Sequence, residues 1–447
     1  MLTMNMIRRD VSRSRGSTAV VLIFVTLASL LMASGTGLIA RLTGSVDALF
    51  EAAVTPDIVQ MHAGAIDELS IRAWARTRPE VAAVQTSELI SLDRRLLELG
   101  GTGRSEADGV MDIGLTVQNA SMDLLLDLEN RPVAPEPGTV GVPVFYALRD
   151  GLVRGDPVRI AGRSFTISDV LRDSQMNPAI VHSKRLVLHP DDFALIRAMI
   201  PETEWLISFR LHDPSTADRV VAAYQATSLP QNGPMVTRDV FRLLNALSNG
   251  VVALVVILTS MVLVGIALLC LRLTILAGLE NDVREIGIMR AIGFRATQIR
   301  RIYVLKYCVI AGLGTILGFL LSLPLVELLT RDLTFMAGPP PPSVLRSLVT
   351  LAGSGLVFAL AVTSSLLVLR RLNRMGALDA LHAEHRAESG RLARLVPLRR
   401  LPSGDPHRWL GVRRVLEQPR FFTLMLVVFM GATAVITVPM HVLHTME

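Results

Sequence analysis

Five uncharged apolar runs constrain this 447-residue chain more than any other feature of its sequence. Each run approaches the roughly 20 residues that an α-helix needs to cross the hydrocarbon core of a bilayer. The chain is also 51% hydrophobic and only 19% charged, which is too apolar for an ordinary soluble enzyme or a disordered chain. The sequence therefore predicts a multi-pass α-helical membrane protein with five transmembrane helices, at 17–40, 248–271, 307–326, 347–369 and 421–440.

The first run could instead be a secretory signal, because Arg8, Arg9, Arg13 and Arg15 precede it. It is, however, longer than the hydrophobic core of about 7–15 residues that signal peptides have. No obvious Ala-x-Ala-like cleavage site follows it either. We therefore interpret the run 17–40 as an uncleaved membrane anchor.

The distribution of charge predicts the orientation of the helices. The chain carries a formal charge of +6, yet residues 41–247 hold 20 basic and 27 acidic side chains. Basic residues concentrate in short segments beside the apolar runs, and such segments stay in the cytoplasm. Three segments are thus expected inside the cell, the N-terminus 1–16, the loop 272–306 and the linker 370–420. Three others are expected outside, the domain 41–247, the short loop 327–346 and the tail 441–447.

The segment 41–247 has the pattern of a large α+β extracytoplasmic domain between helices 1 and 2. Apolar residues predict strands at Asp57–His62 and Glu204–Leu211. Alternating apolar and polar residues in Asp156–Val170, on both sides of an Ala-Gly pair, predict a hairpin. Extended character also resumes at Val81–Val84.

Helices are predicted beside these strands. One covers 67–77, and another follows the cap formed by Asp213 and Pro214. The order of elements predicts one split layer, with 90–190 inserted between its halves and a Gly-rich loop at 99–109. Helical periodicity at 237–246 runs directly into the second apolar run, so we expect one continuous helix there.

No catalytic or metal-binding constellation is visible in this domain. Its histidines are scattered without metal-ligand spacing, and isolated histidines are more often ordinary surface or core residues. The acidic pairs Asp67-Glu68 and Asp191-Asp192 lie at predicted helix starts, where the helix dipole explains them. The two cysteines of the chain, Cys270 and Cys308, lie outside this domain. The histidines concerned are His62, His182, His189 and His212.

Within the apolar runs, small residues recur at four-residue spacing and ionisable residues are missing from the central stretches. Proton- and ion-coupled transporters usually need ionisable groups deep in the membrane, so this class of transporter is disfavoured.

Stripes of small residues let helix backbones approach closely, either within one chain or at a subunit interface. The stripes are Ser29, Ala33 and Gly37, then Gly314, Gly318 and Ser322, and finally Gly355, Ala359 and Thr363. The second stripe contains a GxxxG motif and is the best interface candidate.

The loop 272–306 contains an amphipathic helix. Apolar residues from Val283 to Ile299 drift along one face, and the helix is expected to end at Gly293 and to restart over 296–301. The segment is either a plain positive-inside loop or a docking helix for the groove of a cytosolic partner.

The residues Arg284 to Gly293 (REIGIMRAIG), followed by Gln298-Ile299, resemble the signature of FtsX-like permeases. These are the membrane subunits of MacB/FtsX/LolC-type (type VII) ABC transporters. The segment 370–381 resembles the exit motif of the family, and 144–170 is similar, less specifically, to the MacB-like periplasmic domain. With the arrangement of the spans, the resemblance covers about residues 1–385.

The resemblance implies a division of labour between two subunits. A separate ABC-type ATPase would hydrolyse ATP, and this chain would convert the ATPase's closure into movement outside the bacterial inner membrane by mechanotransmission. The ATPase-coupling residues would be Arg284, Glu285, Gly287, Arg290 and Gly293. The chain itself contains no GxxxxGK[ST] phosphate loop, so we expect no enzyme activity and no cofactor in it, with ATP on the partner.

Three functions remain open at this point. The first is export or extraction (efflux) of a hydrophobic or peptide-like substrate. The second is ATP-driven regulation of an extracytoplasmic cell-wall hydrolase, which binding of the domain to such a hydrolase would reveal. The third is a membrane sensor, for which the linker 370–420 is too short and irregular to supply a signalling domain.

The end of the chain resembles its beginning. Val412-Arg413-Arg414 and Arg420 align at a constant offset with Ile7-Arg8-Arg9 and Arg15. Chance similarity of two positive flanks would explain this, but we prefer a second repeat that begins at 421–440, as in duplicated members of the family. The chain is then a fragment, or a separate protein supplies the second permease half, and homodimer and heterodimer both stay possible. Within the linker, the Pro- and Arg-rich stretch 382–411 is expected to be a solvated inner connector that contacts the ATPase or anionic lipid.

Overall fold

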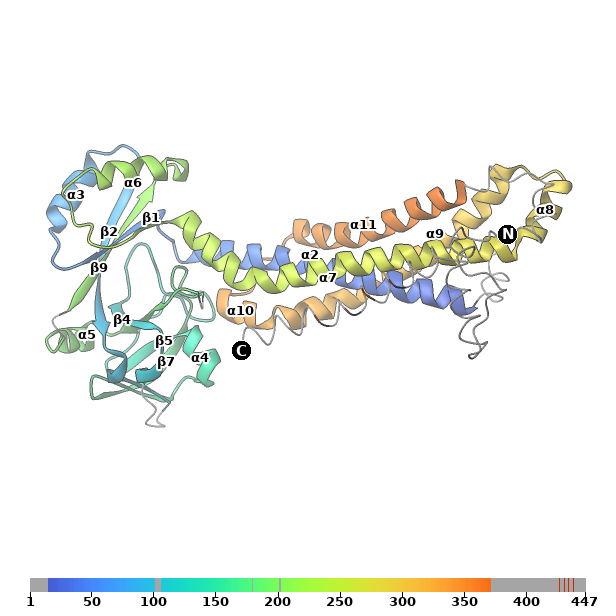
Figure 1. Ribbon diagram of the computed structural model, residues 1–447. Helices are drawn as coiled ribbons and strands as arrows, with labels where there is room; N and C mark the ends of the chain where they lie inside the picture. The colour runs from blue at the N-terminus through green and yellow to red at the C-terminus, as the bar shows by residue number, and fades with distance from the viewer. Residues whose placement is uncertain are drawn as a thin grey trace, which may run out of the picture. The chain divides into compact units, whose positions relative to one another are not determined.

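The computed structural model describes residues 15–100, 106–178, 180–200 and 202–370 (Figure 1). It also describes four helical residues, Leu426, Met430, Thr433 and Thr437. The chain divides into two compact units. We call Ile39–Val251 together with Leu328–Ser343 the sheet domain, and the remainder the helical unit.

Four helices of the described chain are long and apolar enough to cross a membrane. They are α2 (Arg15–Ala52), α7 (Arg238–Asn281), α9 (Ala296–Leu329) and α11 (Val344–Leu369). The first four predicted runs lie within these helices, and the protein is a multi-pass membrane protein. The fifth predicted run, 421–440, lies outside the described residues apart from the four helical positions.

A short helix, α8 (Val283–Ala291), connects α7 to α9. It ends where the sequence predicts, because Gly293 adopts a φ of +105°, which residues with a Cβ rarely adopt. The chain restarts as α9 at Ala296, also as predicted, and this helix continues without interruption through the third apolar run.

The sheet domain contains one mixed sheet of ten strands among its described residues, in the order β10-β1-β9-β2-β4-β8-β5-β7-β6-β3. The strands are β1 (Ile58–Ala63), β2 (Val81–Leu92), β3 (Leu97–Leu99), β4 (Asp112–Val117), β5 (Thr139–Pro143), β6 (Pro157–Ile160), β7 (Arg163–Leu171), β8 (Ser183–Leu188), β9 (Thr203–Leu211) and β10 (Met235–Thr237). The helices are α3 (Glu68–Arg76), α4 (Val144–Asp150), α5 (Pro190–Arg197), α6 (Ala217–Gln225) and α10 (Arg331–Ala337).

Two hydrophobic clusters fix these helices on the sheet. Ile71 of α3 and Tyr224 of α6 pack with Phe209 of β9, so both helices cover the β1–β9–β2 part of the sheet. Tyr146 of α4 and Phe193 of α5 belong to a second cluster with residues of β4, β5, β7 and β8.

The local predictions for this domain are confirmed. A strand lies at 58–63 and a helix at 68–76, and Asp67 caps α3 by accepting from the Leu69 and Ser70 amides. The hairpin β6–β7 turns at Ala161 and Gly162, whose φ values are +49° and +80°, as a type I′ turn requires. Asp213 accepts from the Ser215 amide and caps a 3₁₀ turn, Pro214–Thr216, that leads into α6.

Three details differ from the prediction. Strand β2 is 12 residues long rather than four, and it pairs with both β9 and β4, so the inserted strands extend the same sheet. The predicted loop 99–109 lies partly outside the described residues, and its end, Glu106–Asp108, is a 3₁₀ turn. The loop 327–346 contains α10, which the sequence analysis missed because seven residues are too few to show a helical period.

The two long helices join the sheet at the same end of one strand pair. Helix α2 ends at Ala52, shortly before β1, and α7 begins at Arg238, directly after β10. Strands β1 and β10 pair antiparallel over three residues, starting at Ile58 opposite Thr237. The Arg238 amide also donates to the Asp57 carbonyl at 2.8 Å. The continuous helix predicted from 237 to 246 is thus present as the 44-residue α7.

Candidate coupling site

The predicted coupling residues lie on and just after α8. Ile286 and Gly287 are buried, and Ile286 joins a cluster with Ile299 and Tyr303 of α9. Glu285 and Gly293 are exposed. The remaining two, Arg284 and Arg290, belong to the same helix.

Hydrogen bonds hold both ends of α8, at the junction with α7 and at the turn into α9. The Tyr303 hydroxyl donates to an Asp282 carboxylate oxygen at 2.8 Å, and the Ile286 amide donates to the Asp282 carbonyl at 2.9 Å. The Arg295 amide donates to Gln298 Oε1 at 2.9 Å. Since Gln298 is the third residue of α9, this bond is half of a capping box. Gln298 of the signature therefore stabilises the start of α9.

The described residues leave a second side of α8, and the turn that follows it, uncovered. Ile292 is 72% exposed, Ile288 49% and Phe294 46%. Exposed apolar side chains next to a seated helix face indicate a surface that can receive another molecule. The sequence pattern predicts one broad apolar face, whereas the structure divides the apolar residues between a buried and an exposed side.

The small residues of α9 pack against α2 of the same chain. A Cβ at Gly318 would lie 2.5 Å from the Thr26 carbonyl oxygen, and one at Gly314 would lie 3.0 Å from Val25. Ser322 is fully buried, and Ser29 Oγ donates to the Thr315 carbonyl at 3.2 Å. Of the two alternatives for this stripe, the contacts describe intramolecular packing.

The stripe predicted in α11 is not the face that packs against the described part of the same chain. Gly355, Ala359 and Thr363 are exposed, and a Cβ at Gly355 would meet no atom within 4 Å. The buried face contains Gly353 instead, where a Cβ would lie 2.5 Å from Thr36 Oγ1 of α2. Four-residue spacing alone fits more than one face of this helix, because small residues occur on several of them.

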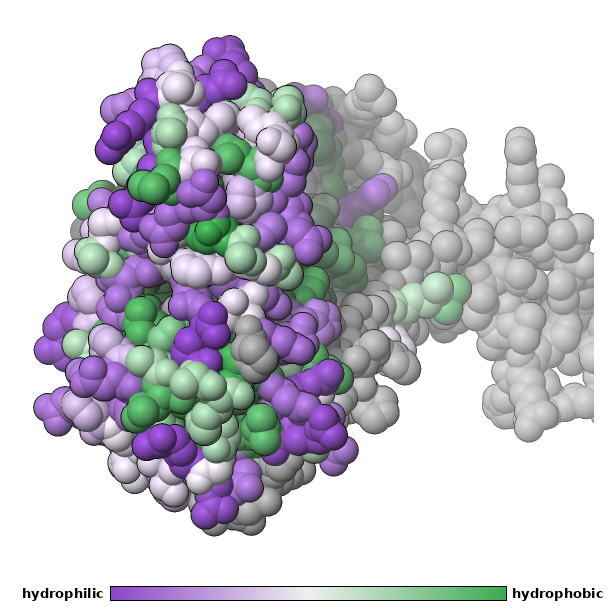
Figure 2. Space-filling view, turned by 90° about the vertical axis from the view of Figure 1, so that its left-hand side faces the viewer, coloured by the Kyte–Doolittle hydropathy of each residue, from purple (hydrophilic) through white to green (hydrophobic). Residues whose placement is uncertain are grey.

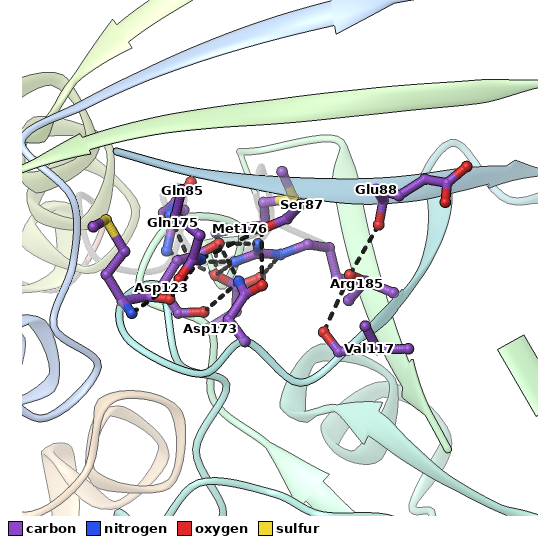
Figure 3. Close-up of polar contacts among 12 residues, drawn as sticks. Gln85, Ser87, Glu88, Val117, Asp123, Asp173, Gln175, Met176 and Arg185 are labelled. Atoms are coloured by element: carbon purple, nitrogen blue, oxygen red, sulfur yellow. Dashed lines mark hydrogen bonds and ion pairs between the residues drawn. The ribbon is translucent and has the colours of Figure 1, made fainter. Parts of the chain in front are cut away.

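The sheet domain contains a buried charge cluster formed by Asp123, Asp173 and Arg185 (Figure 3). Arg185, on β8, donates to Asp123 at 2.5 and 2.9 Å and to Asp173 at 2.7 Å through two nitrogens. The three side chains are at most 3% exposed. Gln175 Nε2 donates to Asp123 at 2.6 Å. Arg185 thus holds together the loops after β4 and β7.

Burial and charge act in opposite directions on the pKa values of this cluster. Burial would raise the pKa of Asp173, but the charge and hydrogen bonds of Arg185 outweigh it and hold that pKa below its usual value. Burial raises the pKa of Asp123, against the attraction of Arg185. The two carboxylates share one guanidinium, so a proton on the cluster would go to Asp123 first. No sequence pattern predicts this cluster, since its members are 50 and 12 residues apart and follow no motif.

Lys184, next to Arg185 on β8, holds the loop between β7 and β8. Its Nζ donates to the carbonyls of Met176 at 2.8 Å, Pro178 at 3.0 Å and Val181 at 2.5 Å. Burial lowers the pKa of Lys184 to about 8, with the charge of Asp173 acting in the opposite direction.

Replacing Lys184 with methionine should reduce the pH dependence of the free energy of unfolding between pH 8 and 10.5. In that window the unfolded chain binds a proton that the folded chain has lost, so the contribution of Lys184 to stability rises with pH. The difference amounts to at most about 3 kcal/mol. Tryptophan fluorescence of wild type and variant during urea unfolding at several pH values measures it. Parallel pH curves for the two proteins would contradict the shifted pKa.

A polar hollow of about 490 Å³ lies beside the start of the loop after β2, lined by Asp93, Arg94, Asp112 and Glu202 among others. Arg94 donates to the Gly109 carbonyl, and Asp93 accepts from Arg95. The face of the sheet domain in Figure 2 mixes hydrophilic residues with small hydrophobic groups. Such a mixture is ordinary for a protein surface. Neither feature indicates a class of ligand.

Comparison with known proteins concerns mainly the helical unit. Residues 255–377 match the family described as FtsX-like permease C-terminal. The matched family is one of permeases, membrane subunits of transporters that are not themselves catalytic. The FtsX-like region includes α8 and its exposed face, α9 and α11.

A solved structure is similar to part of the chain. It is the periplasmic region of MacB from Actinobacillus actinomycetemcomitans, with 12% sequence identity and a TM-score of 0.25. The alignment covers 43% of this chain and 94% of that chain. At this identity and score the likeness carries no further argument. No curated protein sequence matches the chain.

Proposed function

We propose that this chain is the permease subunit of an ABC transporter and converts ATP hydrolysis by a separate ATPase into movement of the sheet domain. The sheet domain lies outside the cytoplasm in this proposal, and α8 lies inside as the coupling helix. The observation that carries the proposal is α8 with the turn that follows it, within the FtsX-like region. Ile286 is buried against α9, whereas Ile288 of α8 and the apolar residues of the turn are exposed.

The contacts of α8 suit a helix that transmits movement from a partner to α9. Burial of Ile286 against Ile299 and Tyr303 means that α8 cannot move without moving the start of α9. The exposed side offers Ile288, Ile292 and Phe294, as a helix in a partner's groove would. ATP binds the partner in this proposal, because the chain has no phosphate loop.

The membrane helices support a cargo class that needs no ion relay. The central stretches of the apolar runs carry no Asp, Glu, Arg or His, so an ion relay lacks its usual groups. Mechanical export or extraction of a hydrophobic or peptide-like molecule needs no such relay. This feature supports a cargo handled by domain movement rather than by an ion-coupled path.

Replacing Ile292 with aspartate or Glu285 with alanine should reduce capture of the ATPase by the tagged full-length chain by at least about tenfold, since both side chains lie on the exposed side. Replacing Gly293 with valine should uncouple ATP hydrolysis, because valine is strained at a φ of +105°. Co-purification and ATPase assays in nanodiscs measure both effects.

The matched control is Arg301→Gln, an exposed position at the start of α9 beyond the turn. It should capture the ATPase as wild type does. Fluorescence of the sheet domain should be unchanged in every variant. Normal capture and coupling in all three variants would rule out α8 and its following turn as the coupling element. Absence of any ATPase in wild-type preparations would contradict the function itself.

A further inference from the structure

The sheet domain holds the last turn of α10. Arg172 Nε donates to the Phe335 carbonyl at 2.9 Å and its Nη2 to the Thr334 carbonyl at 3.1 Å. Asn177 Nδ2 donates to the Met336 carbonyl at 2.7 Å. The final carbonyls of a helix have no partner within it, and a cation there is favourable. A helix of seven residues is too short to be stable alone, so these donors keep α10 in place.

Arg172 is itself fixed from the opposite side. Its Nη1 donates to the Leu128 carbonyl at 2.7 Å and to Asn130 Oδ1 at 3.0 Å. Its backbone forms a bridge with Leu126. Arg172 is 3% exposed and Asn177 4%. Both side chains are therefore buried and held in place within the sheet domain.

The loop that carries these two residues is tied to β8. Asp173 accepts from Arg185, and the carbonyls of Met176 and Pro178 accept from Lys184. Arg185 and Lys184 are neighbours on β8, which lies in the interior of the sheet between β4 and β5. A continuous set of buried polar contacts therefore runs from α10 to an inner strand.

The same α10 lies between two candidate membrane helices in the sequence. Helix α9 ends at Leu329, just before it, and α11 begins at Val344, just after it. Leu333 and Ala337 of α10 also belong to a hydrophobic cluster of the sheet domain that includes Met176. The segment thus belongs structurally to the sheet domain although the chain on either side is membrane helix.

We propose that Arg172 and Asn177 form a latch through which the third and fourth membrane helices hold strand β8 and, in the transport cycle, move it. The role in transport rests on the function proposed above. The latch itself does not, and the test below contains no ATPase. The alternative is that α10 merely covers the domain and passes nothing to β8.

The first measurement is hydrogen exchange of the full-length chain in lipid nanodiscs. Arg172→Met and Asn177→Leu should each raise the exchange rate of the α10 amides by at least about tenfold, because the capping donors are gone. Arg154→Met, at an exposed turn position, is the control and should leave exchange unchanged. Arg172→Lys should restore part of the protection, since it keeps the charge but lacks the planar fork.

The second measurement tests transmission. Gly318→Ala displaces α9 from α2, and it should raise exchange in α10 and in 173–178 by about fivefold in the wild-type background. In the Arg172→Met or Asn177→Leu background, Gly318→Ala should cause no further rise in the exchange rate of the amides at 173–178. Such non-additive effects show that two sites are coupled. Simple addition of the two effects, or no response of 173–178 to Gly318→Ala, would overturn the latch. Should Arg172→Met fail to fold, Asn177→Leu decides, because it removes a single donor.

Discussion

Replacing Arg185 with methionine should destabilise the sheet domain by about 3–5 kcal/mol, the cost of leaving buried charges without their partner. Asp123 and Asp173 would both remain buried, at 1% and 2% exposure, and would lose four hydrogen bonds to the guanidinium. Unfolding of the full-length chain in nanodiscs, followed by the fluorescence of Trp74 and Trp205 of this domain, measures the loss.

Lowering the pH should reduce the difference in free energy of unfolding between Arg185→Met and wild type. In wild type the pKa of Asp173 is lowered, so its contribution is present above the unfolded pKa and is lost as the pH falls through the folded one. In the variant both carboxylates lack the guanidinium, so burial raises their pKa values, and protonation relieves the penalty. The stability gap should therefore shrink as the pH falls from 7 towards 4.

Two companion variants separate the charge effect from a general loss of packing. Arg163→Met, at an exposed position of β7, should change stability by less than about 0.5 kcal/mol. Adding Asp123→Asn and Asp173→Asn to Arg185→Met should recover part of the loss, because neutral amides cost less to bury. An effect of Arg185→Met no larger than that of Arg163→Met would show that the cluster does not hold the domain.

Replacing Gly318 with leucine should destabilise the helical unit by about 3 kcal/mol, the upper end of the range for overpacked sites. The added atoms would meet the Thr26 carbonyl oxygen at 2.5 Å and the Leu30 nitrogen at 2.8 Å. Because both are backbone atoms, they cannot move aside as a flexible side chain would. Helix α9 must therefore separate from α2.

Gly355→Leu in α11 is the matched control, since a Cβ there meets no atom within 4 Å. It should leave stability within about 0.5 kcal/mol of wild type. Denaturation in mixed micelles, followed by pulse proteolysis of the full-length chain, compares the two. Equal losses at both positions would contradict the close approach of α9 and α2.

The parts of the fold that the sequence predicts depend on local patterns. Hydrophobic runs give the four candidate spans, the capping residue Asp67 gives the start of α3, and the Ala161-Gly162 pair gives the β6–β7 hairpin. In each case the physical cause lies within a few residues of the structure that it produces. Gly293 belongs to the same group, because a positive φ ends α8 where the signature places its last glycine.

The parts that the sequence does not predict depend on contacts between distant residues. Arg185 finds Asp123 across 62 positions, and Arg172 reaches Phe335 across 163. Neither spacing has a period, so no window of sequence contains the signal. The buried face of α11 was missed for a related reason, since only the position of α2 decides which small residues are covered.

The place where α2 and α7 join the sheet determines how the domain responds to tension. Both helices attach at the Ile58–Thr237 end of the antiparallel β1–β10 pair. A force that separates the two helices therefore acts on the strand pair at one end. The three residue pairs then break one after another, starting at Ile58 and Thr237. Loading from opposite ends would strain all three together and resist far more. This edge of the sheet is consequently the mechanically soft one, and it would yield before the ladder between β1 and β9, which is twice as long.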